Sequence, residues 1–328
     1  MKQILTNLYG HRKLDREEAR AILVDIGKEV YNEAQIASFI TVYLMRAITV
    51  EELQGFRDAL LELCNPIDLE DRPTIDIVGT GGDGKNTFNI STLSAFVVAG
   101  AGYQVTKHGN YGVSSACGSS NVLEHLGYTF TNQRDALLNQ VDTAGICFLH
   151  APLFHPAMKA VAPIRRNLGV KTFFNMLGPL VNPGQPDYQL FGVYNLELAR
   201  LYQYILQDAG KQFAIVYALD GYDEVSLTGP FKLRTHSADQ LLQPEDLGFP
   251  AYQPEDLFGG NTVPEAARIF TDILSGKGTA AQRDVVCANA GLAIHCIHPE
   301  KALEDCIAEA RKSLQSGKAF KALKSLVD

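Results

Sequence analysis

A glycine-rich segment at residues 79–84 has the residue types that cradle phosphate groups. It reads Gly-Thr-Gly-Gly-Asp-Gly and follows a short apolar run at residues 75–78. Glycines let the backbone adopt positive φ angles and approach a ligand closely, so that its amide groups can face phosphate oxygens. The segment therefore predicts a phosphate loop, although a tight turn without any ligand would use the same residues.

Two classes of nucleotide-binding protein use loops of this kind. The spacing matches the Gly-x-Gly-x-x-Gly fingerprint of dinucleotide sites, but no Asp or Glu follows about 20 residues later to hold the ribose. With Lys85 the loop also approaches a Walker A motif, except that Asn86 stands where a Ser or Thr would bind magnesium. Both alternatives are weakened, and neither is excluded by the loop itself.

The stretch behind the loop, residues 84–123, contains no Asp or Glu although the whole chain carries a net charge of −8. Hydroxyl and amide side chains of this kind donate hydrogen bonds to phosphates without repelling them. We expect Ser91 or Thr92, and Ser119 or Ser120, to cap helices whose N-termini favour anions. Ordinary loop and capping roles are the alternative. The polar side chains of the stretch are Lys85, Asn86, Thr87, Asn89, Ser91, Thr92, Lys107, His108, Asn110, Ser114, Ser115, Ser119, Ser120 and Asn121.

An adjacent acidic pair, Asp223 and Glu224, follows the apolar run at residues 213–219. It is expected in a loop at the carboxyl end of a strand. Magnesium is typically held by one or two carboxylates together with substrate phosphates, so the pair is a candidate metal site. A solvated turn is the alternative.

Basic side chains end a predicted helix at residues 155–166. Arg165 and Arg166 precede a segment with Gly-Pro and Asn-Pro steps at residues 178–183. A guanidinium in that place could bind a carboxylate in the two-pronged geometry that favours arginine. A pair of surface arginines is the alternative.

The elements that must position these residues change character along the chain. Capping signals at Asp15, Asn32 and Thr49 predict three opening helices, and a polar connector with two prolines follows at residues 65–73. After it, short apolar runs at residues 75–78, 103–106, 146–149 and 213–219 alternate with helical stretches beginning at Thr92 and Asn121, and residues 300–327 return to helix. This rhythm predicts an α/β fold, with a mostly parallel central sheet, flanking helices and a smaller all-helical N-terminal domain.

The composition restricts the class of protein. A chain of 328 residues that is 46% hydrophobic and 20% charged is ordinary globular material, and a pI near 5.5 gives no general attraction to nucleic acid. Six scattered cysteines suggest neither a zinc ribbon nor a disulfide framework. The sequence shows no signal peptide and no run long enough to cross a membrane, so we expect a cytoplasmic location.

Taken together, the motifs resemble those of the anthranilate phosphoribosyltransferases, and they do so in order along nearly the whole chain. The matching stretches are Gly-Thr-Gly-Gly-Asp at 79–83, Asn-Ile-Ser-Thr at 89–92, Lys-His-Gly-Asn at 107–110, His-Pro-Ala-Met at 155–158 leading to Arg165, Thr-x-Phe-Asn-x-Leu-Gly-Pro-Leu-x-Asn-Pro at 172–183, Asp-Glu-Val-Ser at 223–226, and Arg-Asp-x-Val-x-x-Asn-Ala at 283–290.

The resemblance implies an enzyme that transfers the phosphoribosyl group of phosphoribosyl pyrophosphate (PRPP) to anthranilate in tryptophan biosynthesis, with Mg²⁺ as two ions. It implies a helical domain at residues 1–70, joined by a returning segment near 165–183, and an α/β PRPP-binding domain at 71–328. It also implies a homodimer without nucleic acid or membrane partners. A pyrimidine-nucleoside phosphorylase and a non-catalytic nucleic-acid-binding relative are the alternatives, and a nucleotide kinase or ATPase is a more distant one.

The resemblance also implies a set of site residues. Metal would be held by Ser91, Asp223 and Glu224. Anthranilate would contact Gly79, Asn110, His155, Arg165 and Gly178, while His108 and His155 are candidates for a general base without an assignment. PRPP would contact Gly79, Gly82, Asp83, Thr87, Asn89, Ile90, Ser91, Thr92, Lys107, His108, Gly109, Asn110, Ser114, Ser115 and Ser119.

Two segments depart from the family pattern, which usually runs Lys-His-Gly-Asn-Arg and then Lys-Ser-Gly-Ser-Ala-Asp. Here Tyr111 replaces the arginine, and residues 116–121 read Ala-Cys-Gly-Ser-Ser-Asn. The replacements remove two cations and a carboxylate near the expected ligand.

Overall fold

Four helices open the chain in the computed structural model, which describes residues 1–112 and 117–327. Three of them begin at the predicted residues, because Asp15, Asn32 and Thr49 each form a capping box with the side chain three residues later. The first helix was not predicted from the sequence, and no side chain caps it. The four are α1 (Lys2–Tyr9), α2 (Arg16–Gly27), α3 (Glu33–Met45) and α4 (Val50–Glu62).

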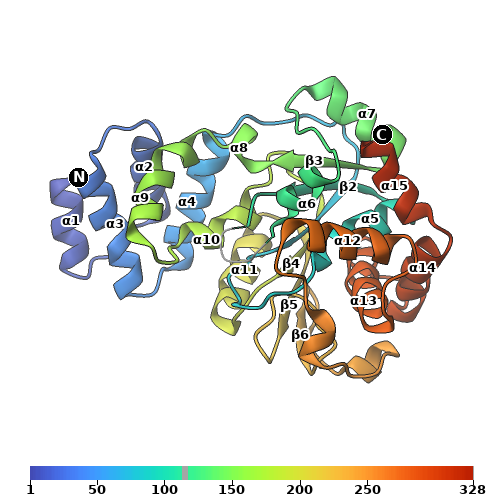
Figure 1. Cartoon of the computed structure of the whole chain (residues 1–328). Coiled ribbons are helices and arrows are strands. Elements are labelled where there is room, and N and C mark those ends of the chain that lie inside the picture. The colour runs from blue at the N-terminus through green and yellow to red at the C-terminus, as the bar shows by residue number, and fades with distance from the viewer. Residues whose placement is uncertain (113–116, 328) are drawn as a thin grey trace. The chain divides into compact units, whose positions relative to one another are not determined.

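These helices belong to a unit made of two separate stretches, Met1–Ile67 and Ala151–Gln185. The second stretch is wider than the expected returning segment, and its helix α9 packs against α2 and α3 (Figure 1). It contributes α8 (Ala151–Phe154), α9 (Ala157–Leu168), α10 (Phe174–Leu177) and the 3₁₀ turn η1 (Gly178–Val181).

A buried charge pair fixes the turn between α3 and α4. The carboxylate of Glu52, fully buried, accepts hydrogen bonds from both terminal nitrogens of Arg46 at 2.6 and 2.8 Å and from the amide of Leu14 at 3.0 Å. The same residue completes the capping box of α4. The pKa of Glu52 is lowered, because these hydrogen bonds together outweigh the effect of burial, which by itself raises it.

The second unit, Asp68–His150 and Pro186–Asp328, is built on a seven-stranded sheet in the order β3-β2-β1-β4-β5-β6-β7. Pairing is parallel from β3 to β5 and antiparallel for the last two strands, so the predicted mostly parallel sheet is confirmed. The strands are β1 (Thr74–Gly79), β2 (Gln104–Gly109), β3 (Ile146–His150), β4 (Tyr188–Gly192), β5 (Gln212–Ala218), β6 (Phe231–Arg234) and β7 (Asp239–Leu242).

Helices pack on this sheet around one apolar core. The central helices of the core, α5 and α13, are apolar on nearly every side, as expected for buried helices. The predicted C-terminal helix is divided into α14 and α15 at residues 316–317. The helices are α5 (Ile90–Gly100), α6 (Ser119–His125), α7 (Arg134–Ala144), α11 (Leu196–Asp208), α12 (Val263–Leu274), α13 (Ala280–Ile297), α14 (Leu303–Gln315) and α15 (Lys318–Val327), with 3₁₀ turns η2 (Pro244–Leu247) and η3 (Pro254–Leu257).

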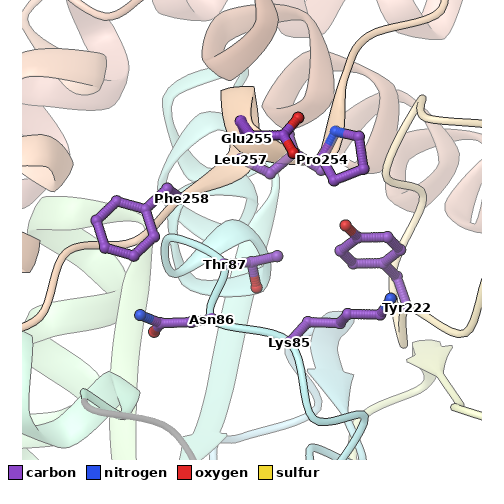
Figure 2. Close-up of a pocket in the computed structure, with 8 residues that line it drawn as sticks. All are labelled: Lys85, Asn86, Thr87, Tyr222, Pro254, Glu255, Leu257 and Phe258. Carbon is purple, nitrogen blue, oxygen red and sulfur yellow. The ribbon is translucent and has the colours of Figure 1, made fainter.

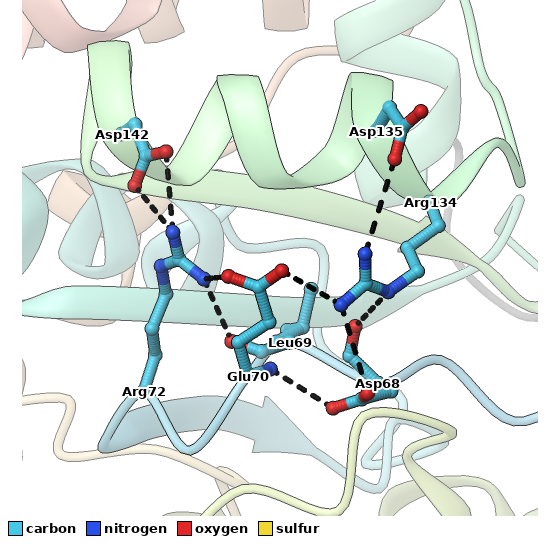
Figure 3. A network of polar contacts seen from close by, with 7 residues as sticks. All are labelled: Asp68, Leu69, Glu70, Arg72, Arg134, Asp135 and Asp142. Carbon is cyan, nitrogen blue, oxygen red and sulfur yellow. Dashed lines mark hydrogen bonds and ion pairs between the residues drawn. The ribbon is translucent and has the colours of Figure 1, made fainter.

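Part of the predicted connector is held on the surface of the α/β unit by ion pairs (Figure 3). Arg72 binds Asp142 of α7 at 3.1 Å and Glu70 at 2.9 Å, and Arg134 of α7 binds Glu70 at 2.8 Å. Each exposed pair contributes little by itself, but the shared carboxylate of Glu70 joins both arginines. Residues 68–72 are therefore attached to α7 rather than forming a free linker.

Among residues 1–112 and 117–327, no helix combines the length and the apolar character that crossing a membrane requires. Each of the six cysteines is a buried free thiol.

The closest approach of α2 and α4 depends on a glycine. A Cβ atom on Gly55 would clash with the carbonyl oxygen of Arg16 and lie 2.9 Å from the amide of Arg20, both backbone atoms. We expect Gly55→Ala to lower the free energy of unfolding by about 1–3 kcal/mol, because the two helices must separate. Gly10→Ala is the matched control, since its Cβ would lie 3.4 Å from the nearest atom. Equal thermal unfolding of both variants would contradict this packing.

Candidate functional site

The glycine loop leaves the carboxyl end of β1 in a conformation that requires its glycines. Gly81, Gly82 and Gly84 have φ angles of +64°, +76° and +78°, a region that side chains disfavour. Gly79 has another reason, because a Cβ atom there would clash with the carboxylate of Asp223. The loop therefore has the backbone geometry that the sequence predicts for a phosphate loop.

The loop lies where the order of strands reverses. In chain order the strands run from β1 outward to β3 and then resume at β4, on the other side of β1. Gly79 is opposite Gly192 in the register of β1 and β4, and Gly192 is opposite Val216 of β5. Ligands of open α/β sheets bind at such a switch point, outside the carboxyl ends of the strands.

Asp223 is placed over this point by backbone contacts. Its carbonyl oxygen lies so close to Gly192 that any side chain at that position would overlap it, and its Oδ2 accepts a hydrogen bond from the Gly81 amide at 2.6 Å. Asp223 is buried, which argues against the alternative of a solvated turn. The acidic pair thus lies at the carboxyl ends of β1 and β4.

Three carboxylates meet here, those of Asp83, Asp223 and Glu224, with one oxygen from each within 4.8 Å of the others. Burial, and then repulsion from Asp223, raises the pKa of Asp83 to about 6. The same two causes raise the pKa of Glu224 well above its usual value, although Thr87 donates a hydrogen bond to it at 3.0 Å. A divalent cation would offset this repulsion, and oxygen ligands of this kind are those that magnesium prefers.

Lys107 of β2 places a buried amine near Asp223 of the same cluster. Burial lowers its pKa, whereas the negative charges of Asp76 and Asp223 act to raise it. The neighbouring His108 is also buried, and its backbone amide donates to Asp76 at 3.2 Å. Lys107 and the acidic cluster are therefore close enough to influence each other.

The predicted helix caps are wrong in detail. The capping position of α5 is Asn89, whose side-chain amide donates to the carbonyl of Cys117 at 3.2 Å, so Ser91 and Thr92 lie inside its first turn together with Ile90. The capping position of α6 is Gly118 rather than Ser119 or Ser120. Both N-termini still belong to the predicted polar stretch.

Two further predicted PRPP residues are joined to each other. The carbonyl oxygen of Asn110 accepts a hydrogen bond from the Ser119 hydroxyl at 3.3 Å. The preceding Gly109 closes in on Ser119 so tightly that a Cβ atom would clash with its hydroxyl. Ser114 and Ser115 lie outside the described residues.

A pocket of about 450 Å³ opens beside the loop (Figure 2). The ammonium group of Lys85 lies over the ring of Tyr222, 4.5 Å from its centre, and Thr87 connects the pocket to Glu224. The chain at residues 86–88 pairs with residues 257–259, which fixes one wall. The lining residues are Lys85, Asn86, Thr87, Tyr222, Pro254, Glu255, Leu257 and Phe258.

Asn289 of α13 was part of a matching motif, but no role was predicted for it from the sequence. Its buried side chain binds both backbone groups of Val225: it accepts a hydrogen bond from the amide at 3.1 Å and donates one to the carbonyl at 2.8 Å. It also donates to the carbonyl of Val285 at 2.8 Å. Val225 directly follows the acidic pair. Asn289 therefore holds the loop that carries Asp223 and Glu224.

The helical unit holds the other predicted residues. His155 is buried between elements of that unit, and burial lowers its pKa to about 4. Arg165 in the last turn of α9 is half-buried, with its guanidinium 5.3 Å from the centre of the Phe174 ring and 3.4 Å from Asn175 Oδ1. Gly178 begins η1 and is exposed.

Comparison with known proteins agrees with this geometry. The a/b domain of a glycosyl transferase family matches residues 71–320, and its helical bundle domain matches residues 2–64. A relative from Cytophaga hutchinsonii is 58% identical over 100% of both chains, and one from Bacteroides fragilis is 58% identical over 100% of this chain and 99% of its own. Both are named anthranilate phosphoribosyltransferase. The chain belongs to the anthranilate phosphoribosyltransferase family. The resemblance found in the sequence is thus confirmed.

Solved structures of family members have the same fold. The enzyme from Thermus thermophilus aligns with a TM-score of 0.92 and 33% identity over 98% of both chains. The enzyme from Saccharomyces cerevisiae, in complex with PRPP and Mg, aligns with a TM-score of 0.91 and 28% identity over 99% of this chain and 96% of that one. The predicted fold class, a mostly parallel sheet with flanking helices and an N-terminal helical domain, is confirmed.

Removing one charge from the acidic cluster should weaken metal binding. We expect Asp223→Asn to raise the Mg²⁺ concentration that gives half-maximal activity by tenfold or more, because the amide keeps the shape but not the charge. Titrating activity with Mg²⁺ measures this. Glu304→Gln, which removes an exposed carboxylate of α14 outside the pocket and the cluster, is the matched control. A wild-type Mg²⁺ titration for Asp223→Asn would contradict the metal assignment.

Asn289 should matter through the donors of its side chain. In Asn289→Asp the carboxylate still accepts from Val225 but faces two carbonyls without a proton to donate, so the acidic loop should shift. We expect about a tenfold higher Mg²⁺ requirement in protein that remains folded. Asn195→Asp is the control, because Asn195 only accepts a hydrogen bond, from Leu198 at 2.8 Å. If both variants titrate alike, Asn289 does not position the loop.

Proposed function

We propose that this chain transfers the phosphoribosyl group of PRPP to anthranilate, giving N-(5-phosphoribosyl)anthranilate and pyrophosphate, a step of tryptophan biosynthesis. The names of its relatives support this, as do yeast structures of the family in complex with PRPP and Mg and with 4-fluoroanthranilate. The observation that carries the proposal is the cluster of three carboxylates facing a glycine loop at the switch point of the sheet.

In this reaction the anthranilate nitrogen forms a bond to C1 of the ribose while the bond from C1 to the pyrophosphate oxygen breaks. Negative charge therefore grows on the leaving pyrophosphate, and positive charge grows on the ribose. Donors that can stabilise that negative charge are the Nζ group of Lys107 and backbone amides of the glycine loop beyond Thr80 and Gly81, whose own amides donate to Gly192 and Asp223. The amine proton is released as the new bond forms.

We further propose that the enzyme uses two Mg²⁺ ions, which Asp223, Glu224 and Ser91 would hold. Burial, and then repulsion from Asp223, raises the pKa values of Asp83 and Glu224, so a bound cation would be favoured beside these three carboxylates. Bound magnesium would neutralise charge on the pyrophosphate. PRPP itself would contact the loop, the first turn of α5, and residues of β2 and α6.

Neither candidate base is assigned. With its pKa lowered to about 4, His155 is neutral at pH 7 and only a weak base. His108 is buried on β2, with its backbone held by Asp76. A neutral aromatic amine becomes acidic as it reacts, so the reaction does not require a strong base.

The proposed anthranilate contacts are Gly79, Asn110, His155, Arg165 and Gly178. Arg165 would bind the carboxylate, because a guanidinium can bind a carboxylate in two-pronged geometry, and this one lies 5.3 Å from the centre of the Phe174 ring. We further propose that the two units are the functional domains, and that the protein is a cytoplasmic homodimer, as expected for this family.

A direct assay tests the function. Protein mixed with PRPP, Mg²⁺ and anthranilate should consume anthranilate, measured as loss of its fluorescence, and should release pyrophosphate in equal amount. Omitting PRPP is the control. Folded protein that leaves anthranilate unchanged would contradict the proposal.

The same assay separates the alternatives. A pyrimidine-nucleoside phosphorylase would cleave nucleosides with inorganic phosphate and without a need for magnesium. A nucleic-acid-binding relative would bind DNA in a salt-dependent way. Pyrophosphate release from PRPP that depends on anthranilate distinguishes the proposed enzyme from both.

A further inference from the structure

A buried hydrogen bond joins two residues that are not among the proposed PRPP, anthranilate or metal contacts. The hydroxyl of Ser120, in the first turn of α6, lies 2.9 Å from Nδ1 of His150, the last residue of β3. Ser120 is fully buried and His150 is 5% exposed. Ser120 also stands where the family pattern has alanine, so the bond belongs to the segment in which this chain departs from that pattern.

Aromatic rings hold the imidazole of His150 from two sides. The ring of Phe130 stacks on it with centres 4.2 Å apart at 15°, and the ring of Tyr111 meets it edge-on at 5.0 Å and 83°. The Tyr111 hydroxyl donates to Glu124 of α6 at 3.1 Å. Burial lowers the pKa of His150, while Glu124 acts to raise it. The imidazole is therefore fixed in place, and Tyr111, another departure, is part of what fixes it.

The backbone connects this pair to residues proposed to bind PRPP. The carbonyl of Asn110 accepts from the amide of Ser120 at 3.2 Å as well as from the hydroxyl of Ser119. Asn121 strengthens the same arrangement, since its Oδ1 accepts from the amides of Gly112 and Gly118, both at 3.0 Å. Ser119, Ser120 and Asn121 form the first turn of α6. Their positions therefore depend on where that helix begins.

We propose that Ser120 and His150 are positioning residues for PRPP, which hold the start of α6 so that Ser119 and Asn110 face the substrate. This inference rests on the proposed function. Neither residue needs to touch PRPP, because each acts through the backbone of the α6 start. Tyr111, Ser120 and Asn121, three residues that differ from the family pattern, then belong to one network of contacts. This network joins β2, β3 and α6 without the charged residues of that pattern.

A double-mutant cycle tests the pair. Ser120→Ala leaves the His150 nitrogen without its partner, and His150→Phe keeps a ring between Phe130 and Tyr111 but leaves the Ser120 hydroxyl without one. A buried polar group that loses its partner is costly, whereas replacing both partners by apolar groups can be nearly neutral. We expect each single variant to raise the KM for PRPP about tenfold, and the double variant to return to within about threefold of wild type.

The control separates positioning from stability. Ser313→Ala removes another buried hydroxyl, which donates to the carbonyl of Val97 at 2.7 Å in the core, and it should lower the thermal midpoint without changing the KM for PRPP. The KM for PRPP and the thermal midpoint are measured for all four variants. Single variants with a wild-type KM, or a double variant as impaired as the two singles combined, would overturn the inference.

Wild-type activity is measured first in the same assay. If the wild-type protein consumes anthranilate with PRPP and the variants keep its KM, only the positioning role is wrong. An inactive wild-type protein would contradict the proposed function, and the PRPP-positioning role with it.

Discussion

The contact between the backbone of Asp223 and Gly192 is the constraint on which the site depends. No side chain fits at Gly192, and none fits at Gly79 beside the Asp223 carboxylate. Both strands must therefore end in glycine for the acidic loop to lie over them. From the other side, Asn289 of α13 holds the residue that follows the acidic pair. Strand ends, loop and helix thus fix the carboxylates before any ligand binds, which is the preorganisation that electrostatic stabilisation requires.

Charge explains why so rigid a support is needed. Three carboxylates within 4.8 Å repel one another, and this repulsion adds to burial in raising the pKa values of Asp83 and Glu224. Such a cluster would relax apart in a mobile loop. Lys107, buried on β2, offsets part of the repulsion from within the same unit. The repulsion also explains why residues 84–123 contain no Asp or Glu, since further negative charge there would add to the electrostatic cost of the acidic cluster.

Much of this could be predicted from the sequence, because its signals are local. Capping boxes at Asp15, Asn32 and Thr49 located helices, and alternation of apolar runs with helical stretches gave the parallel sheet. The parallel strand β4 and the antiparallel strands β6 and β7 were not predicted, because each is only four or five residues long and partly polar. Three features could not be predicted because each joins residues that are far apart in the chain. They are the place of Asp83 in the acidic cluster, the hydrogen bonds of Asn289 to Val225, and the hydrogen bond between Ser120 and His150. Only tertiary packing brings such partners together.

The helical unit is made of two stretches, and this affects how the chain can fold as it is synthesised. Helices α1 to α4 leave the ribosome first, but α9, which packs against α2 and α3, follows only after β1 to β3 have been made. The apolar faces of α2 and α3 that pack against α9 therefore stay exposed until α9, about a hundred residues later in the sequence, has been made. Domains generally fold as units during synthesis, in order from the N-terminus. Here the first unit to begin is complete only at residue 185, after a large part of the second unit has been made. Its apolar helix faces stay exposed in the meantime, and surfaces of this kind are those that chaperones bind.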